Sequence, residues 1–164
     1  MSFARGRELV LTPGPSVMPD RVLRAMQRPA PNIYEGELVE ITDSILRDLG
    51  RLAGTAGETA LYVSNGHGVW EAALSNLFGP GDAILAVASG TFGHGWADTG
   101  RVMGLDVEVL EFGRHAPVDP TALGERLKED TAHRIKGILV VHADTSSSVR
   151  NDVPRLRQAI DDVG

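Results

Sequence analysis

The clearest structural signal in the chain is the stretch Ala60-Leu61-Tyr62-Val63-Ser64-Asn65-Gly66-His67-Gly68-Val69-Trp70-Glu71-Ala72-Ala73-Leu74. Its first apolar residues predict a short buried strand, the small residues after them predict a turn, and the remainder has a helical pattern. Backbone N–H groups at a helix start are unpaired and lie at the positive end of the helix dipole, so this turn can bind a phosphate. The same arrangement is also an ordinary strand-to-helix connection, and the stretch alone leaves both interpretations open.

The chain from residue 60 onward alternates apolar runs with helical patterns. Strands are expected at Ala60–Ser64, Ala83–Ala88, Asp106–Glu111 and Gly137–His142. Helices are expected at His67–Phe78, Phe92–Met103 and Pro120–Asp130, with a last one starting near Asp152. Asp119-Pro120 supplies the cap and the first-turn proline of a helix start. This order predicts an α/β fold with right-handed crossovers, a three-layer αβα arrangement around a mainly parallel sheet.

The first sixty residues differ from the rest of the chain. Thr12-Pro13-Gly14-Pro15-Ser16 predicts an extended, turn-rich arm, because proline fits neither a helix interior nor a central strand. Apolar side chains at helical spacing then predict a helix of about fifteen residues; they are Leu38, Ile41, Ile45, Leu49 and Leu52. We expect an N-terminal arm with a short helix over residues 1–36 and the first part of a large domain over residues 37–164.

Composition excludes several classes of function. The net charge is −6 and the sequence contains no cluster of lysines or arginines, which argues against a surface that binds nucleic acid. The longest apolar runs are too short to span a bilayer, and the N-terminus lacks an apolar signal core, so we expect a cytoplasmic protein that does not bind membranes. The absence of cysteine excludes disulfides, thiolate metal sites and a cysteine nucleophile in this chain.

Three predicted turns follow the carboxyl ends of strands, where parallel sheets bind their ligands. They are Asn65-Gly66-His67, Ser89-Gly90-Thr91-Phe92-Gly93-His94 and Asp144-Thr145-Ser146-Ser147-Ser148. Together they offer backbone amides for a phosphate, a flat aromatic ring and hydroxyl donors. Each also has a purely structural interpretation, since an aromatic ring at a helix start can pack in the core and serines can cap a turn.

Metal and nucleotide sites are poorly supported by the sequence. His142 and Asp144 could face the same side of a strand, but no third ligand is visible and no metal site is expected. Gly66-x-Gly68 lacks the third glycine of the dinucleotide fingerprint, and no lysine follows a glycine run as in a phosphate-binding loop. A nucleotide-binding domain is therefore disfavoured, and no serine stands in a nucleophile elbow.

In order and spacing, the motifs resemble the N-terminal part of the class V aminotransferases, which are pyridoxal-phosphate (PLP) enzymes of fold type I. The alanine–glyoxylate and serine–glyoxylate (serine–pyruvate) group is the most similar. The resemblance runs through Thr12–Ser16, Gly66-His67 ahead of Glu71–Leu74, Gly79-Pro80-Gly81-Asp82, Gly90-Thr91-Phe92-Gly93 and His142–Val149. Ser148 departs from the pattern, because relatives commonly carry a glycine there.

The resemblance implies roles for particular residues. Asn65, Gly66 and His67 would bind the cofactor phosphate, and Phe92 would stack on the pyridine ring. Thr145 and Ser146 would hydrogen-bond near the ring oxygen or the substrate, and Gly14 would lie near the substrate carboxylate. The family's Schiff-base lysine, its aspartate for the ring nitrogen and its carboxylate-binding arginine would all fall beyond Gly164. No catalytic residue is therefore expected within these 164 residues.

The implied reaction is transamination between alanine or serine and a 2-oxo acid such as glyoxylate or pyruvate, in a homodimer whose arm reaches toward the partner. The cysteine desulfurase branch is disfavoured by the segment His142–Val149. Lys128 and Lys136, the chain's only lysines, are expected away from the site, so the 164-residue chain is expected to be inactive by itself. The alternative is a non-catalytic binding or scaffold module that kept the fold without the catalytic half.

Overall fold

The computed structural model describes residues 12, 14 and 16–164. The chain divides into two compact units, one ending at Leu61 and one spanning Tyr62–Gly164. The expected boundary between residues 36 and 37 stays a prediction. Thr12 and Gly14 lie in bends, while Pro13, Pro15 and the first eleven residues fall outside the described residues. Within the described part of the chain, no helix is long and apolar enough to cross a membrane.

The described residues of the first unit form two helices, α1 (Asp20–Met26) and α2 (Glu37–Ala53). The predicted amphipathic helix is confirmed by α2, which ends at Gly54 in the left-handed conformation with φ 63°. After the helix, the Thr59 hydroxyl donates to the Leu46 carbonyl at 2.9 Å, and this bond holds the following segment against α2. None of the α2 residues is buried within the described chain, and Leu52 is 85% exposed.

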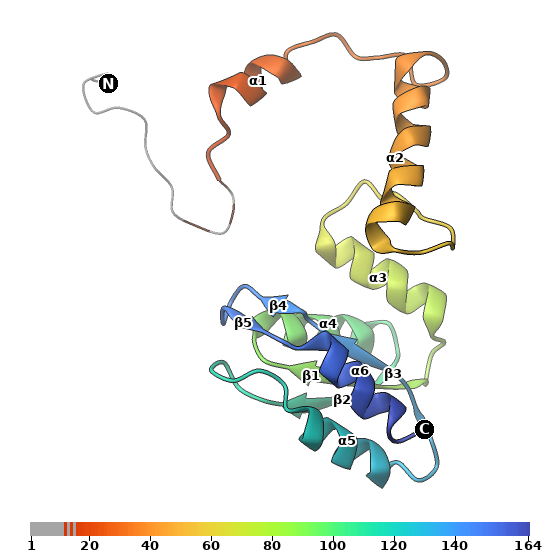
Figure 1. Cartoon of the computed structure of the whole chain (residues 1–164), viewed down its shortest axis with the longest axis vertical. Coiled ribbons are helices and arrows are strands. Elements are labelled where there is room, and N and C mark those ends of the chain that lie inside the picture. The colour runs from red at the N-terminus through yellow and green to blue at the C-terminus, as the bar shows by residue number, and fades with distance from the viewer. Residues whose placement is uncertain (1–11, 13, 15) are drawn as a thin grey trace, which may run out of the picture. The chain divides into compact units, whose positions relative to one another are not determined.

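The second unit contains the remaining nine elements (Figure 1). In chain order they are α3 (Gly66–Leu77), β1 (Ala83–Ala88), α4 (Thr91–Val102), β2 (Asp106–Glu111), α5 (Pro120–Glu129), β3 (Ile135–Val140), β4 (Ala143–Asp144), β5 (Val149–Arg150) and α6 (Val153–Asp161). Strands β2, β1 and β3 form a parallel sheet in that spatial order, and β4 and β5 form a separate antiparallel pair. The α/β prediction is confirmed.

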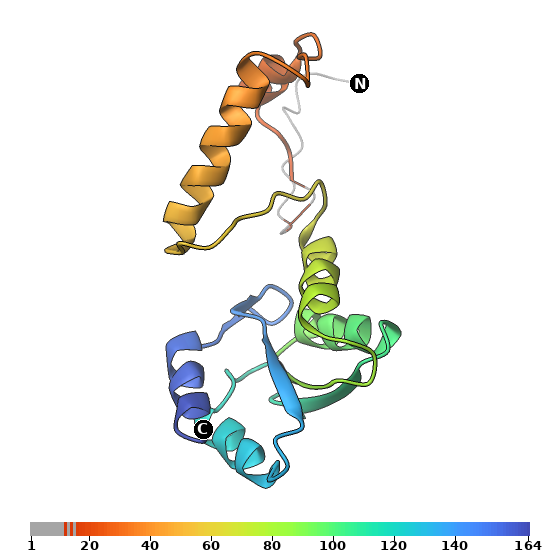
Figure 2. The same cartoon turned by 90° about the vertical axis from the view of Figure 1, so that its right-hand side faces the viewer.

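Helices cover both faces of the parallel sheet, as Figure 2 shows, with α5 and α6 on one side and α4 on the other. The central strand β1 is buried along almost its whole length, and its side chains alternate between two cores. Ile84 and Ala86 pack with residues of α3 and α4, whereas Leu85 and Val87 pack with Leu123 and Leu156 of α5 and α6. The predicted three-layer arrangement is present.

One predicted strand is absent. Ala60–Ser64 forms no strand among the described residues, and Val63 is fully exposed. A strand needs a neighbour for its backbone hydrogen bonds, and no strand of the described residues pairs with this segment. The apolar composition of this segment therefore did not suffice to make it a strand. The β3 prediction was shifted, because the strand starts at Ile135 rather than Gly137.

The carboxyl ends of β1 and β3 are joined by one buried polar side chain. Asn151 is 1% exposed, and its amide nitrogen donates to Ser89 Oγ at 3.1 Å and to the Val141 carbonyl at 2.7 Å. Its amide oxygen accepts the Val118 N–H at 2.8 Å, just before α5. Buried amides are stable only when such partners are present. The strand ends that frame the candidate site are thus fixed relative to one another.

Candidate functional site

The turn before α3 has the geometry of a capped helix start. Asn65 is extended, with φ −97° and ψ −174°, and its side-chain oxygen accepts the His67 N–H at 3.0 Å. Apart from its two chain neighbours and the backbone of its own helix, no described residue has a heavy atom within 4 Å of a Cβ built on Gly66, so the space beside this residue is open. By contrast, a Cβ on Gly68 would overlap the Ser64 side chain. The two glycines therefore have different roles, since only Gly66 borders free space.

Four aromatic rings gather where α3 meets α4. The His67 ring lies 4.6 Å from that of Trp70 and 6.2 Å from that of Phe92, between ring centroids. Trp70 and Trp96 stack at 5.6 Å with planes 13° apart. The Trp96 indole nitrogen is buried and has no hydrogen-bond partner in the described part of the chain. Such a cluster offers flat, polarisable surface to a ring-shaped ligand.

A cavity of about 310 Å³ lies between these rings and the end of β3. Its lining residues are Trp70, Phe92, Trp96, Val140, Val141, His142, Ala143 and Thr145. They come from α3, from α4 and from the end of β3 with the segment after it, which includes β4 and lies at the carboxyl edge of the sheet. A mostly apolar concavity with a few polar groups at such an edge is the usual setting of a ligand site.

The start of α4 is closed by side chains from the β4–β5 region. The Thr91 N–H donates to Ser146 Oγ at 2.7 Å. The next two amides, of Phe92 and Gly93, donate to Asp144 Oδ2 at 2.9 and 3.2 Å. All three amides of this first turn therefore have acceptors within the chain. Of the two helix starts, whose rings His67 and Phe92 are neighbours, α3 has open space next to Gly66, whereas the first-turn amides of α4 all have acceptors.

Asp144 is a buried carboxylate, 1% exposed, that hydrogen bonds keep ionised. Its other oxygen, Oδ1, accepts the Ser146 N–H at 3.0 Å and the Ser146 hydroxyl at 2.6 Å. Burial acts to raise the pKa of this carboxyl, but the bonds from Ser146, Gly93 and Phe92 outweigh it and hold the pKa below its ordinary value. Asp144 faces α4, while His142 is exposed at the cavity. Among the described residues, no three metal-ligating side chains gather.

The structure brings together most of the residues singled out in the sequence. His67 and Phe92 are ring neighbours, and Phe92 and Thr145 line the same cavity. Ser146 hydrogen-bonds to Asp144 and to Thr91, whereas the Thr145 hydroxyl has no partner among residues 16–164. Gly14 belongs to the first unit, and its role stays a prediction.

Both lysines lie away from the cavity. Lys136 is the second residue of β3 and pairs with Asp82, which precedes β1, so it stands at the opposite end of the parallel strands. Lys128 is exposed in the last turn of α5. Neither amine lines the cavity that holds Phe92 and Thr145.

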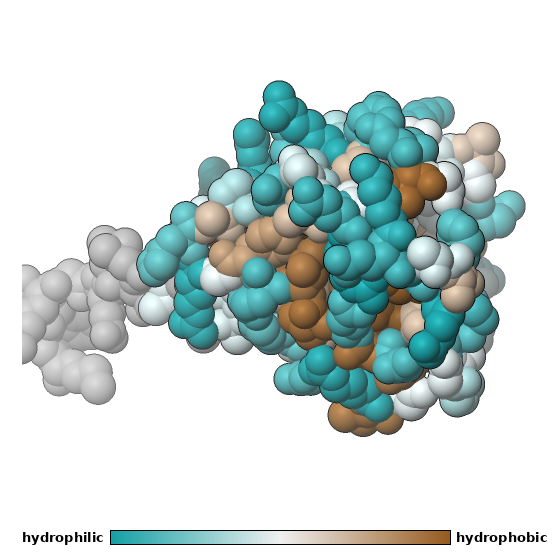
Figure 3. Space-filling model, turned by 90° about the horizontal axis from the view of Figure 1, so that it is seen from below, coloured by the Kyte–Doolittle hydropathy of each residue, from teal (hydrophilic) through white to brown (hydrophobic). Residues whose placement is uncertain are grey.

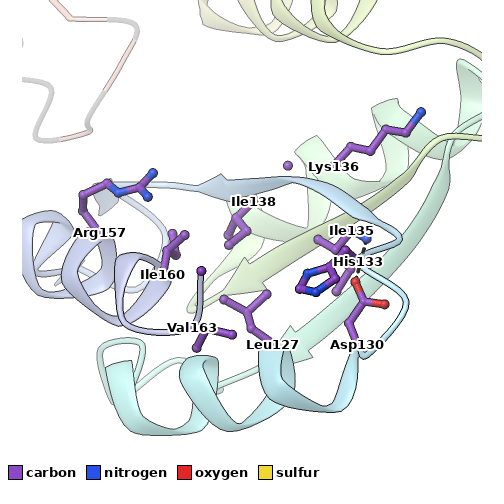
Figure 4. Close-up of a pocket in the computed structure, with 11 residues that line it drawn as sticks. Leu127, Asp130, His133, Ile135, Lys136, Ile138, Arg157, Ile160 and Val163 are labelled. Carbon is purple, nitrogen blue, oxygen red and sulfur yellow. Dashed lines mark hydrogen bonds between the residues drawn. The ribbon is translucent and has the colours of Figure 1, made fainter.

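A second cavity, of about 290 Å³, lies between the start of β3 and the helices α5 and α6 (Figure 4). Its floor is apolar, with Leu127, Ile138 and Ile160, and on the face seen from below hydrophobic surface shows between hydrophilic residues (Figure 3). Three of its polar side chains are engaged, since Asp130 accepts the Ile135 N–H at 2.8 Å, Arg157 pairs with Asp161 and Lys136 pairs with Asp82. This end of the sheet therefore offers less chemistry than the carboxyl end.

Comparison with known proteins gives consistent matches. The serine–glyoxylate aminotransferase of Methylorubrum extorquens is 36% identical over 160 residues, which cover 97% of this chain and 40% of that protein. The protein of the same name from Arabidopsis thaliana is 31% identical over 160 residues, with the same coverage of both chains. Over nearly its whole length the chain is similar in sequence to these glyoxylate aminotransferases. It spans about 40% of the length of these curated relatives and matches an N-terminal portion of them.

The fold agrees with this relationship to the glyoxylate aminotransferases. The aspartate aminotransferase of subgroup IV from Thermus thermophilus superposes with a TM-score of 0.82 and 26% identity, over 96% of this chain and 43% of that one. No protein-family model matches the chain. The structure is thus similar to the large domains of PLP aminotransferases.

Proposed function

We propose that this chain is the N-terminal, cofactor-phosphate-binding part of a PLP-dependent aminotransferase. The observation that most supports this is the meeting of three groups at one edge of the sheet. They are the open turn at Gly66, the ring of Phe92 and the free hydroxyl of Thr145, the last two lining one cavity. The relatives named serine–glyoxylate aminotransferase support the same conclusion.

The residues present fit PLP in chemical type. A helix start with free space suits a phosphate dianion, because the dipole and the amide hydrogens both favour negative charge. In this proposal Asn65, Gly66 and His67 hold the phosphate, Phe92 stacks on the pyridine ring and Thr145 hydrogen-bonds to a ring substituent. Ser146 keeps its bonds to Thr91 and Asp144 and so holds the start of α4 in place without contacting the cofactor.

When bound, PLP supplies an electron sink for carbanion chemistry at the amino-acid substrate. The chain's own residues bind and orient it. Phe92 fixes the plane of the ring, the apolar walls at Val140 and Val141 exclude water from one side, and the start of α3 neutralises the phosphate. The proton-transferring amine of a transaminase is not available from Lys128 or Lys136. We therefore assign binding and orientation, and no proton transfer, to these 164 residues.

The proposed reaction exchanges the amino group of alanine or serine with glyoxylate or pyruvate. We also propose a homodimer, in which the proline-rich segment around Gly14 reaches toward the partner and approaches the substrate carboxylate. The support for the substrates is the naming of the relatives. The support for the dimer is the exposed apolar surface of the first unit, where Ile33 is 65% and Tyr34 87% exposed.

A titration with PLP tests the proposal, because Trp70 and Trp96 are the chain's only tryptophans and both line the cavity. Saturable quenching of their emission by PLP, competed by inorganic phosphate, is the expected result. Emission that PLP leaves unchanged would overturn the assignment of the cofactor site.

The reading frame downstream of Gly164 tests the alternative of a non-catalytic module. A following strand with an aspartate and then a Ser-x-Lys-type segment, together with turnover of serine or alanine against glyoxylate by the longer product, supports the enzyme. A stop codon there supports the module.

A further inference from the structure

The hydrogen bonds between Asp144 and α4 span about fifty residues of sequence and meet at the wall of the cavity. The Asp144 carboxylate accepts from Phe92 and Gly93 on one oxygen and from Ser146 on the other, at distances between 2.6 and 3.2 Å. Phe92 lines the cavity from α4 and Thr145, the residue after Asp144, lines it from the β4–β5 region. One buried side chain therefore connects the two walls.

Gly90 shows that this connection is tightly built. The φ of Gly90 is 172°, an extended value that any residue adopts, so its backbone conformation does not require glycine. Space requires it, because a Cβ at this position would overlap the carboxyl group of Asp144, at 2.5 and 2.6 Å from its two oxygens. Gly93 is similarly close to β1, where a Cβ would lie 3.0 Å from the Ala88 Cα.

We propose that Asp144 is a positioning residue for the cofactor site. By holding the first turn of α4 against the β4–β5 region, it sets the separation between the Phe92 ring and the Thr145 hydroxyl. This role rests on the proposed function, because the groups that Asp144 positions are those assigned to the pyridine ring. It involves no direct contact between Asp144 and the cofactor.

The chemistry of the four hydrogen bonds explains why a carboxylate is needed. All four partners donate, and only an ionised carboxylate offers acceptors on both oxygens. Asparagine, which has nearly the same shape, turns one acceptor into a donor and places it against an N–H. The Asp144→Asn variant therefore keeps the volume and loses one side of the connection.

The proposed phosphate subsite allows the experiment to distinguish a loss of ring binding from a general loss of structure. It lies at the start of α3, where Asn65 and His67 interact with each other and not with Asp144. Loss of the Asp144 bonds should weaken the binding of the ring and leave the binding of the anion unchanged. A general loss of structure would weaken both.

The test measures three ligands on the full chain: PLP and pyridoxal by quenching of Trp70 and Trp96, and inorganic phosphate by its competition with PLP. For Asp144→Asn we expect about tenfold weaker binding of PLP and pyridoxal, the scale of a lost charge-assisted hydrogen bond, with phosphate affinity unchanged. The control is Asp119→Asn, which alters another aspartate cap, at α5, where the Thr121 N–H is accepted at 2.9 Å. This control should leave all three affinities unchanged.

Amide hydrogen exchange of Thr91, Phe92 and Gly93 in the ligand-free chain provides a second readout. We expect faster exchange at these three amides in Asp144→Asn and not in Asp119→Asn. Gly90→Ala is the second variant, because it displaces the carboxylate without removing it, and it should give the same two effects should Asp144→Asn fold poorly.

The outcomes separate the two proposals. If the wild-type chain does not bind PLP, the proposed function fails and the positioning role with it. If the wild type binds PLP and Asp144→Asn binds pyridoxal equally well despite faster amide exchange, the positioning role is overturned and the cofactor site stands. An equal loss of phosphate and pyridoxal affinity also overturns the role, because it indicates general unfolding of the site.

Discussion

Asn151 and Ser89 are 62 residues apart in sequence, and the side-chain amide of Asn151 donates to the Ser89 hydroxyl at 3.1 Å. The same amide group also bonds to the Val141 carbonyl and to the Val118 N–H. Three strand or loop ends beside the cavity thus depend on one buried side chain.

Asn151→Ala should destabilise the fold strongly. It removes three hydrogen bonds and leaves the buried Val118 N–H and Val141 carbonyl without that partner, which costs about 2–4 kcal/mol in the free energy of unfolding. Urea denaturation measures the loss. The matched control is Asn76→Ala on α3, where an exposed amide donates to the Ala72 carbonyl at 2.7 Å, and its effect should stay within about 0.5 kcal/mol. Equal effects of the two variants would contradict this prediction.

A bulky residue at Gly66 should prevent PLP binding without unfolding the chain. Since nothing lies within 4 Å of a Cβ built on Gly66 in the described structure, Gly66→Leu is accommodated, but it fills the space assigned to the phosphate. We expect at least about tenfold weaker affinity for PLP, measured by tryptophan quenching, and for inorganic phosphate, measured by its competition with PLP. Ser75→Leu, at an exposed position further along α3, is the control. Unchanged cofactor affinity in Gly66→Leu would refute the phosphate assignment.

The stabilising effect of Asp144 should disappear in acid. Hydrogen bonds to the carboxylate place its pKa in the folded chain below 3.8, despite the opposing effect of burial. A group whose pKa is lowered by folding stabilises the fold above its unfolded pKa, and this stability is lost as pH falls through the folded value. The difference in unfolding free energy between wild type and Asp144→Asn should therefore be about 2 kcal/mol near neutral pH and shrink below about pH 4. A difference that stays constant from neutral pH into acid would be the contrary result.

The 164-residue chain should give no specific PLP adduct after borohydride reduction, and no transamination. A transaminase needs a lysine amine at the cofactor, whereas Lys136 is paired with Asp82 and Lys128 is exposed on α5. Mass spectrometry of the reduced, digested chain measures adduct formation at each lysine. A single stoichiometric adduct on Lys128 or Lys136, together with turnover of alanine or serine against glyoxylate, would show that the lysine argument is wrong.

Self-association should depend on the apolar side chains of the first unit. Met18, Ile33 and Tyr34 are 45%, 65% and 87% exposed. Single exposed apolar side chains are ordinary, but several in one unit indicate an interaction surface. We expect sedimentation of the longest natural form to give a dimer at micromolar concentration, and Ile33→Ser with Tyr34→Ser to weaken it. A monomer in the wild type would count against the two-fold assembly.

The sequence was sufficient where local signals and burial agree. The strands Ala83–Ala88 and Asp106–Glu111 have the predicted bounds. The first is a continuous apolar run because both of its faces are buried, and the second alternates because only one of its faces is covered. The predicted helix start at Asp119-Pro120 is also confirmed, since Asp119 accepts the Thr121 N–H. These features depend on residues close in sequence.

The sequence was insufficient where residues far apart interact. Asp144 was considered as half of a metal pair and as the first residue of a candidate ligand-binding turn, because nothing near it in sequence indicates that its partners are the amides of Phe92 and Gly93. The segment at Val63 was expected to be a strand from composition alone, which does not report whether a pairing edge exists. Ser148, which departs from the family pattern, takes a left-handed φ of 58°, the conformation that a glycine adopts freely.

The Asn65 cap on α3 has a consequence for selectivity among anions. In the ligand-free chain the His67 amide already has an acceptor, the side-chain oxygen of Asn65. An anion that accepts the His67 N–H must replace the Asn65 oxygen as its acceptor. The net gain in binding free energy is therefore only the difference between a bond to the anion and a bond to a neutral carboxamide. A singly charged anion gains little binding free energy from this replacement, whereas a dianionic phosphate ester gains more. Competition from the Asn65 side chain therefore favours phosphorylated ligands over abundant small anions.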